Sequence, residues 1–251
     1  MAATRLHAHE RNVASIARAI AVGTDAVVVA VTVSSNPLAL SGVWINGVKL
    51  HEAVARLFGD SFHALEASAR AAGLKCQLPR AFVIVGHSAG GNLAVSASGF
   101  STEQRDSEAA LVVTNLRGIV MLDGVDRGGL MAAGLDKLKP HSIPVRTIAA
   151  PDCSWNANGS GTKVLKSKRP NEFIGVVLAN GSHIDAEAAE SGTLAEWSCG
   201  ASSKANVEAL QLLAVVWIRD FFAKSTTPEA LAETSAGTVS TLPNGAVATT
   251  L

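Results

Sequence analysis

The chain has 251 residues, 48% of them hydrophobic and 17% charged, so it is long and apolar enough to fold as a globular domain rather than remain disordered. Lys and Arg together number 21, as do Asp and Glu. This balance argues against the basic surface with which proteins bind nucleic acid or anionic lipid. Aromatic residues make up 4% of the chain, which disfavours a surface that stacks sugars or bases.

Helical patterns alternate with β-branched runs along most of the chain. Apolar residues at helical spacing predict helices at residues 12–22, 50–58, 62–72, 92–99 and 205–222. Continuous apolar runs predict strands buried on both faces at residues 26–33, 81–85, 118–122, 145–150 and 173–178. The alternation predicts an α/β fold with a mostly parallel sheet and helices on both faces.

The end of the chain differs in composition. Residues 225–251 are rich in Ala, Thr, Ser and Gly, and we interpret them as a flexible tail that follows a single domain over residues 1–224. The first eleven residues lack the apolar segment of a secretory signal, and the apolar stretch at residues 212–218 is too short to span a bilayer. We therefore expect a soluble chain, cytoplasmic as given or secreted if its N-terminus is incomplete.

Three cysteines, Cys76, Cys153 and Cys199, are too few for a disulfide framework, and none has the spacing of a metal site. Cys153 and Cys199 both fall near later parts of the site proposed below. Two alternatives remain, a bridge between them or two half-buried free thiols, and we favour the thiols.

Residues 86–90 form a G-x-S-x-G motif, Gly-His-Ser-Ala-Gly, between the expected strand 81–85 and the helix that follows. A strand that turns sharply into a helix forces its serine into strained backbone angles, and small neighbours let the turn close. This geometry exposes the hydroxyl and aims the next backbone N–H at the same point. We therefore predict Ser88 as a nucleophile and Ala89 as an oxyanion donor.

A serine hydroxyl needs a base to take its proton. His183 is the candidate because it follows the last expected parallel strand, and Gly181 gives its loop the freedom to bring the imidazole to Ser88. His87 is adjacent to Ser88, but we expect it to point away from the turn and to pack or hydrogen-bond locally. Substrate contact is the alternative for His87.

The imidazole in turn needs a carboxylate to fix its tautomer and stabilise its charge. With a serine on such a turn, the acid lies between the serine and the histidine in chain order. Asp123 ends an apolar strand, where a buried carboxylate needs a partner, and Asp152 lies just past the following strand, after a proline. The choice between them stays open. Asp126 and Asp185 are further alternatives, although we expect Asp185 to hold the loop of His183.

The sequences GHSAGG at 86–91, IP at 143–144 and GSH at 181–183 resemble the chlorophyllase and cutinase-like polyester-hydrolase branch of the α/β hydrolases. The resemblance covers roughly residues 12–222. It implies an α/β-hydrolase fold, hydrolysis of small or polymeric carboxylic esters in a shallow apolar cleft, and no cofactor. In cutinase-like members the acid's position corresponds to Asp152, and in chlorophyllases to Asp123.

The chain departs from this family at its N-terminus. The fold has further strands before its first helix and a loop that supplies a second oxyanion donor, whereas here residues 6–10 (LHAHE) are all that stands for that loop. One lost donor costs roughly 3 kcal/mol of transition-state stabilisation. We expect a truncated or atypically short, N-terminally shortened member. A weakly active or non-catalytic binding protein is the alternative function, and an acyltransferase, thioesterase or peptidase would use the same residues.

Two tryptophans are candidate walls of a substrate cleft. Trp44 lies in the expected loop 34–48, and Trp155 lies three residues past Asp152. Ordinary packing of a large apolar side chain under a loop is the alternative for each.

Overall fold

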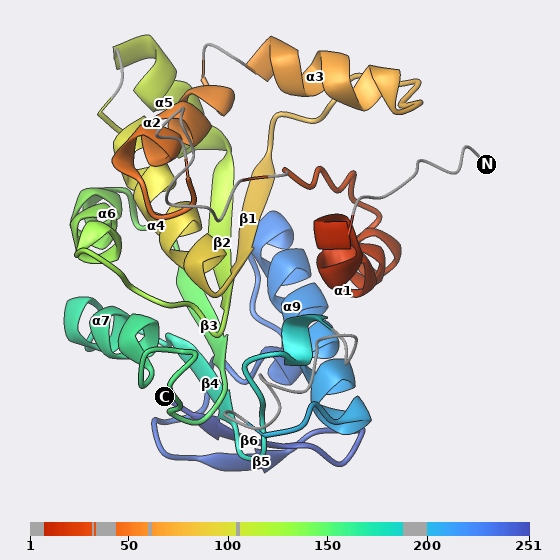
Figure 1. Ribbon diagram of the computed structural model, residues 1–251, viewed down its shortest axis with the longest axis vertical. Coiled ribbons are helices and arrows are strands. Elements are labelled where there is room, and N and C mark those ends of the chain that lie inside the picture. Colours follow the sequence, from red (N-terminus) through yellow and green to blue (C-terminus); the bar gives the residue numbers. More distant parts are fainter. Residues whose placement is uncertain (1–7, 32, 34–43, 60–61, 104–105, 188–199) are drawn as a thin grey trace.

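The computed structural model describes residues 8–31, 33, 44–59, 62–103, 106–187 and 200–251 (Figure 1). The strands are β1 (Phe82–His87), β2 (Leu116–Leu122), β3 (Val145–Ala149), β4 (Gly175–Leu178), β5 (Val239–Thr241) and β6 (Val247–Thr250). The α-helices are α1 (Ala8–Thr24), α2 (Val48–Leu57), α3 (Phe62–Ala71), α4 (Ala89–Ser101), α5 (Asp106–Asn115), α6 (Leu130–Leu138), α7 (Ser160–Lys168) and α9 (Lys204–Ala223). Short 3-10 turns are η1 (Lys139–His141), η2 (Asp185–Glu187) and η3 (Pro228–Ala230).

The strands form one mostly parallel sheet in the order β1-β2-β3-β4-β6-β5. β1 to β4 are parallel neighbours, and β6 pairs antiparallel with both β4 and β5. Parallel strands need long crossover connections, and helices supply them here. The predicted α/β architecture is therefore confirmed.

Helices cover both faces of the sheet (Figure 1), α1 and α9 on one side and α4, α6 and α7 on the other. Alternate side chains of β2 pack into the cores on the two faces of the sheet, because successive side chains of a strand point to opposite faces. Val120 and Leu122 belong to the core under α1 and α9, whereas Ile119 and Met121 belong to the core under α4 and α6. This double burial explains the continuous apolar run that identified β2 in the sequence.

The expected buried strand at residues 26–33 is wrong. Its described part, residues 26–31 and 33, has no regular secondary structure, and Val27, Val28, Val29 and Val31 are 38–58% exposed. A valine run favours extended backbone, but it does not supply the neighbouring strand and the covering helices that burial requires.

The expected flexible tail at residues 225–251 is also wrong. The segment forms η3, β5 and β6, and β6 pairs with β4 inside the sheet. Small side chains fit where the sheet meets the core under α9, so Ala248 and Ala230 are fully buried without any large apolar residue. The dipeptide Asn244-Gly245 is a hairpin signal, and Gly245 takes the left-handed conformation that the turn needs (φ 83°).

Candidate active site

Ser88 lies on the tight turn between β1 and α4. Its backbone is strained, with φ 55° and ψ −123°. Gly86 permits the turn, because a Cβ there would stand 2.1 Å from the carbonyl oxygen of Gly90. The backbone of Ser88 is also fixed to the neighbouring strand end, since its N–H donates to Leu122 (3.1 Å) and its carbonyl accepts from Val125 (3.0 Å).

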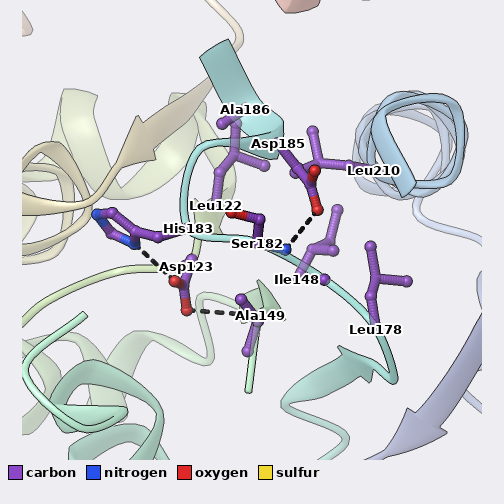
Figure 2. A pocket seen from close by; sticks show the side chains of 12 residues that line it. Leu122, Asp123, Ile148, Ala149, Leu178, Ser182, His183, Asp185, Ala186 and Leu210 are labelled. Atoms are coloured by element: carbon purple, nitrogen blue, oxygen red, sulfur yellow. Dashed lines mark hydrogen bonds and ion pairs between the residues drawn. The ribbon is translucent and has the colours of Figure 1, made fainter. Parts of the chain in front are cut away.

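Ser88, His183 and Asp123 form a continuous hydrogen-bonded chain. Nε2 of His183 lies 3.0 Å from Ser88 Oγ, and Nδ1 lies 2.6 Å from Asp123 Oδ2. A carboxylate only accepts, so the proton sits on Nδ1 and leaves Nε2 to accept from the serine hydroxyl. Figure 2 shows His183 and Asp123 meeting, and both side chains are almost fully buried. The two residues predicted as nucleophile and base are thus brought together.

Asp123 is held by donors from the loop after β3. Its Oδ1 accepts from the Ala150 N–H (3.2 Å), and its Oδ2 accepts from Asn156 Nδ2 (3.1 Å). Asn156 is completely buried, and its own Oδ1 accepts from the N–H groups of Cys153 and Gly159, both at 2.9 Å. The sequence analysis missed Asn156. Its Asn-Ala-Asn-Gly context signals a turn, but nothing in that signal points to Asp123.

Asp152, the other candidate acid, does not reach His183. Its carboxylate is 57% exposed and forms an ion pair with Lys163 at 2.7 Å. Pro151 and Asp152 carry the chain outward from β3 into the turn that returns Asn156 to the interior. Of the two aspartates that the sequence left open, Asp123 is the one whose carboxylate contacts His183.

Cys153 in the same turn is disulfide-bonded, so the expected free thiol is wrong at this position. Cys76 is free and exposed. Cys199, the partner considered from the sequence, lies outside the described residues.

The loop that carries His183 is closed by Asp185. The Asp185 carboxylate accepts from the Ser182 N–H (2.7 Å; Figure 2) and from the Ser202 hydroxyl (2.7 Å). Burial raises the pKa of Asp185, and these hydrogen bonds oppose that rise. Asp185 therefore holds the loop, as the sequence predicted.

His87 packs and hydrogen-bonds locally, as the sequence favoured over substrate contact. Its Nε2–H donates to the backbone carbonyl of His183 (2.8 Å), and its Nδ1 lies 3.6 Å from Glu187 Oε1. Burial, followed by the nearby His183, lowers the pKa of His87 to about 4, so the ring is neutral near pH 7.

Ala89 is the first residue of α4, where a helix leaves its N–H groups without intrahelical partners. Because Ala89 directly follows Ser88 in the sequence, its N–H can donate a hydrogen bond to an oxyanion that forms at the Ser88 hydroxyl. Of residues 6–10, the stretch that stands for the loop of the second oxyanion donor, residues 8–10 begin α1, and residues 6 and 7 lie outside the described residues.

The two tryptophans differ in setting. Trp44 packs against its own turn, since a Cβ on Gly47 would lie 2.9 Å from the Trp44 ring. Trp155 is 48% exposed and directly precedes Asn156, the residue that donates to Asp123. Trp155 is thus the more exposed of the two.

The space behind the triad is almost completely filled. A cavity of about 10 Å³, room for roughly one water molecule, lies between Asp123, His183 and Asp185 and the apolar side chains shown in Figure 2. On the outer side of the turn, a Cβ at Gly90 would meet no atom within 4 Å. The space beside Gly90 is therefore open, whereas the space beside Asp123 and His183 is nearly filled.

No family model, curated protein or solved structure matches the chain. Among the described residues, no group of three or more His, Cys, Asp or Glu side chains is arranged to hold a metal ion. Within the same part of the chain, none of the helices combines the length and apolar character needed to cross a membrane.

Proposed function

We propose that this chain is a serine hydrolase that cleaves carboxylic esters through an acyl-enzyme on Ser88, on an α/β-hydrolase type of fold. The observation that carries the proposal is the chain of contacts from Ser88 Oγ to His183 (3.0 Å) and from His183 to Asp123 (2.6 Å). The strained backbone of Ser88 is a second support, because a turn of this kind is costly and is retained where it positions a reacting group.

In the first half of the reaction, Ser88 Oγ attacks the ester carbonyl while Nε2 of His183 takes the hydroxyl proton. Asp123 stabilises the imidazolium that forms, and the Ala89 N–H donates to the carbonyl oxygen as it becomes negative. Collapse of this intermediate breaks the bond to the leaving alcohol, which receives the proton from His183. Water then repeats the sequence on the acyl-enzyme and releases the carboxylic acid.

The position of the acid supports one branch of the sequence resemblance. Asp123 follows β2, the strand next to β1, which corresponds to the acid position of chlorophyllases. The cutinase-like position corresponds to Asp152, whose carboxylate pairs with Lys163 instead. A thioester or amide would meet the same nucleophile, base and acid, so a panel of acyl substrates is needed to assign the leaving group.

The test is hydrolysis of short-chain p-nitrophenyl esters together with labelling by a fluorophosphonate probe. We expect the wild type to turn over the ester and to be labelled on Ser88. Ser88→Ala should lose labelling and lower kcat by at least about 10⁴-fold.

Ser235→Ala is the matched control, because Ser235 is exposed beside the C-terminal hairpin, far along the chain from the site. It should keep wild-type rates. Ester hydrolysis that survives in Ser88→Ala, or a wild type that the probe does not label, would contradict the proposed function.

A further inference from the structure

The dipeptide His87-Ser88 contacts the base at two separate points. Ser88 Oγ meets the imidazole of His183 at 3.0 Å, and the His87 ring donates from Nε2 to the backbone carbonyl of the same residue at 2.8 Å. The two imidazole rings also pack together, with centroids 4.8 Å apart and planes inclined by 41°. One contact fixes the ring of the base, and the other fixes the backbone from which that ring extends.

The hydrogen bond to the carbonyl defines the tautomer of His87. A carbonyl oxygen only accepts, so Nε2 of His87 carries the proton and Nδ1 is left as an acceptor. Nδ1 lies 3.6 Å from Glu187 Oε1 on η2, the turn that follows the His183 loop. Burial raises the pKa of Glu187, and the nearby His183 opposes that rise.

We propose that His87 is a positioning residue that holds the backbone of His183, and so its imidazole, at the distance from Ser88 that proton transfer requires. This inference rests on the proposed function, because it explains how His183 is placed to act as the base in that reaction. The loop of His183 is also held by Asp185, which accepts from the Ser182 N–H, and by the Ser182 hydroxyl, which donates to the Gly200 carbonyl. The His87 hydrogen bond ties that loop directly to the nucleophile turn, and misplacement by about 1 Å can cost 10²-fold in rate.

Two substitutions separate positioning from simple packing. His87→Gln places an amide N–H near the former Nε2 and can restore the bond to the His183 carbonyl, whereas His87→Leu fills a similar volume without a donor. We expect His87→Leu to slow fluorophosphonate labelling of Ser88 by about 10- to 100-fold. His87→Gln should recover to within about 5-fold of the wild type. If the ring only filled space, the order would reverse, since Leu suits an apolar site better than Gln.

Histidine NMR gives a second readout that needs no turnover. Resonances of ¹⁵N-labelled protein should show His87 as the Nε2–H tautomer, and His87→Leu should shift or broaden the Nδ1–H signal of His183, while His87→Gln should restore it. An Nδ1–H tautomer for His87, or a His183 signal identical in His87→Leu and the wild type, would overturn the inference.

The two proposals fail in different ways. A wild type that the probe does not label defeats the proposed hydrolase function, and the NMR experiment still decides whether His87 holds His183. A labelled wild type with equally fast labelling of His87→Leu defeats the positioning role alone.

Discussion

Asp123 reaches His183 because β2 ends one residue before it, at the same sheet edge from which β4 delivers the histidine loop. Asp123 adopts a left-handed backbone conformation (φ 46°), which aspartate tolerates better than most residues. The conformation turns its carboxylate along the edge toward the β3 side, where Ala150 and Asn156 donate to it. Strand order and one unusual backbone angle together select this aspartate.

Exchange of each candidate acid for its amide tests that selection. Asp123→Asn should lower kcat for a p-nitrophenyl ester by roughly 10⁴-fold, because an amide at this position favours the wrong histidine tautomer and cannot stabilise the imidazolium. Asp152→Asn should leave kcat unchanged, since it removes only an exposed ion pair with Lys163. Steady-state kinetics of the two variants side by side is the measurement. A large loss in Asp152→Asn with a mild one in Asp123→Asn would reverse the assignment.

His87 also makes the stability of the protein depend on pH. Its pKa is about 4 in the folded chain and near the ordinary value of 6.5 in the unfolded chain, so the unfolded state binds the extra proton between these values. The contribution of His87 to the free energy of unfolding is complete above pH 6.5 and decreases as the pH falls toward 4. The decrease amounts to about 3 kcal/mol.

Urea unfolding of the wild type and of His87→Gln at pH 7.5, 6, 5 and 4 checks this, because glutamine does not titrate. The stability of the wild type relative to His87→Gln should decline over this interval. The raised pKa values of Asp185 and Glu187 act in the opposite direction, favouring the folded state at acid pH, and are present in both proteins. Repeating the comparison of His87 with His87→Gln in a Glu187→Gln background removes the contact partner of His87. If the difference in the free energy of unfolding between wild type and His87→Gln does not change from pH 7.5 to pH 4, the expectation is contradicted.

Among the elements, α4 and α6 approach each other backbone to backbone. A Cβ built on Gly99 of α4 would lie 2.6 Å from the Cα of Gly134 on α6, and a Cβ on Gly134 would lie 2.7 Å from the carbonyl oxygen of Val95. Real Cβ atoms do not approach backbone atoms so closely. The helix that follows Ser88 is thus anchored in its second half by contacts that only glycine permits.

Gly99→Ala should therefore destabilise the fold, although alanine is the better helix former. Overpacking at this crossing should cost about 1–3 kcal/mol. Gly90→Ala in the same helix is the matched comparison, because its Cβ would meet nothing within 4 Å and should leave stability equal or up to about 1 kcal/mol higher. Urea midpoints of both variants provide the measurement. Equal midpoints would mean that the two helices separate without cost.

Sequence patterns predict these elements only where burial leaves a strong signature. β2 and β3 are identified by apolar runs that serve two cores, and α9 by a long amphipathic stripe. β6 was missed because its buried positions are occupied by small residues such as Ala248, which carry no apolar signal. Residues 26–33 show the opposite error. Their valines favour extended backbone and so predicted a strand, but the sequence signal does not supply the partner strand that pairing requires.

The candidate site divides in the same way. Ser88, Ala89 and His183 follow from a motif and from strand ends, which depend on local sequence. The choice of Asp123 over Asp152 and the function of Asn156 depend on the path of the loop after β3, which brings together residues more than thirty positions apart. No local pattern encodes such a meeting.

At the scale of the whole molecule, the C-terminal hairpin completes the sheet rather than trailing from it. β6 covers the outer edge of β4, the strand that leads into the loop of His183. Ala248 is fully buried in the same core as Trp217 of α9. The hairpin therefore belongs to the structure that supports the base.

Ala248→Asp should accordingly destabilise the protein by about 3 kcal/mol or more, because it places an unpaired charge in the core. Val239→Asp, on the exposed β5 at the sheet margin, is the matched control and should change stability by less than about 0.5 kcal/mol. Thermal and urea unfolding of both variants would show the difference. A flexible tail would tolerate the two substitutions equally.

The close contact between Gly99 of α4 and Gly134 of α6 also determines which parts of the molecule can open. Backbones in direct contact cannot slide without separating, so the amides of α4 that are hydrogen-bonded within the helix should exchange with deuterium only through global unfolding. The His183 loop has no such crossing and is held by side-chain hydrogen bonds that open individually. Slow exchange in α4 beside faster exchange at residues 181–184 would mean that the helix after Ser88 opens less often than the loop that carries His183.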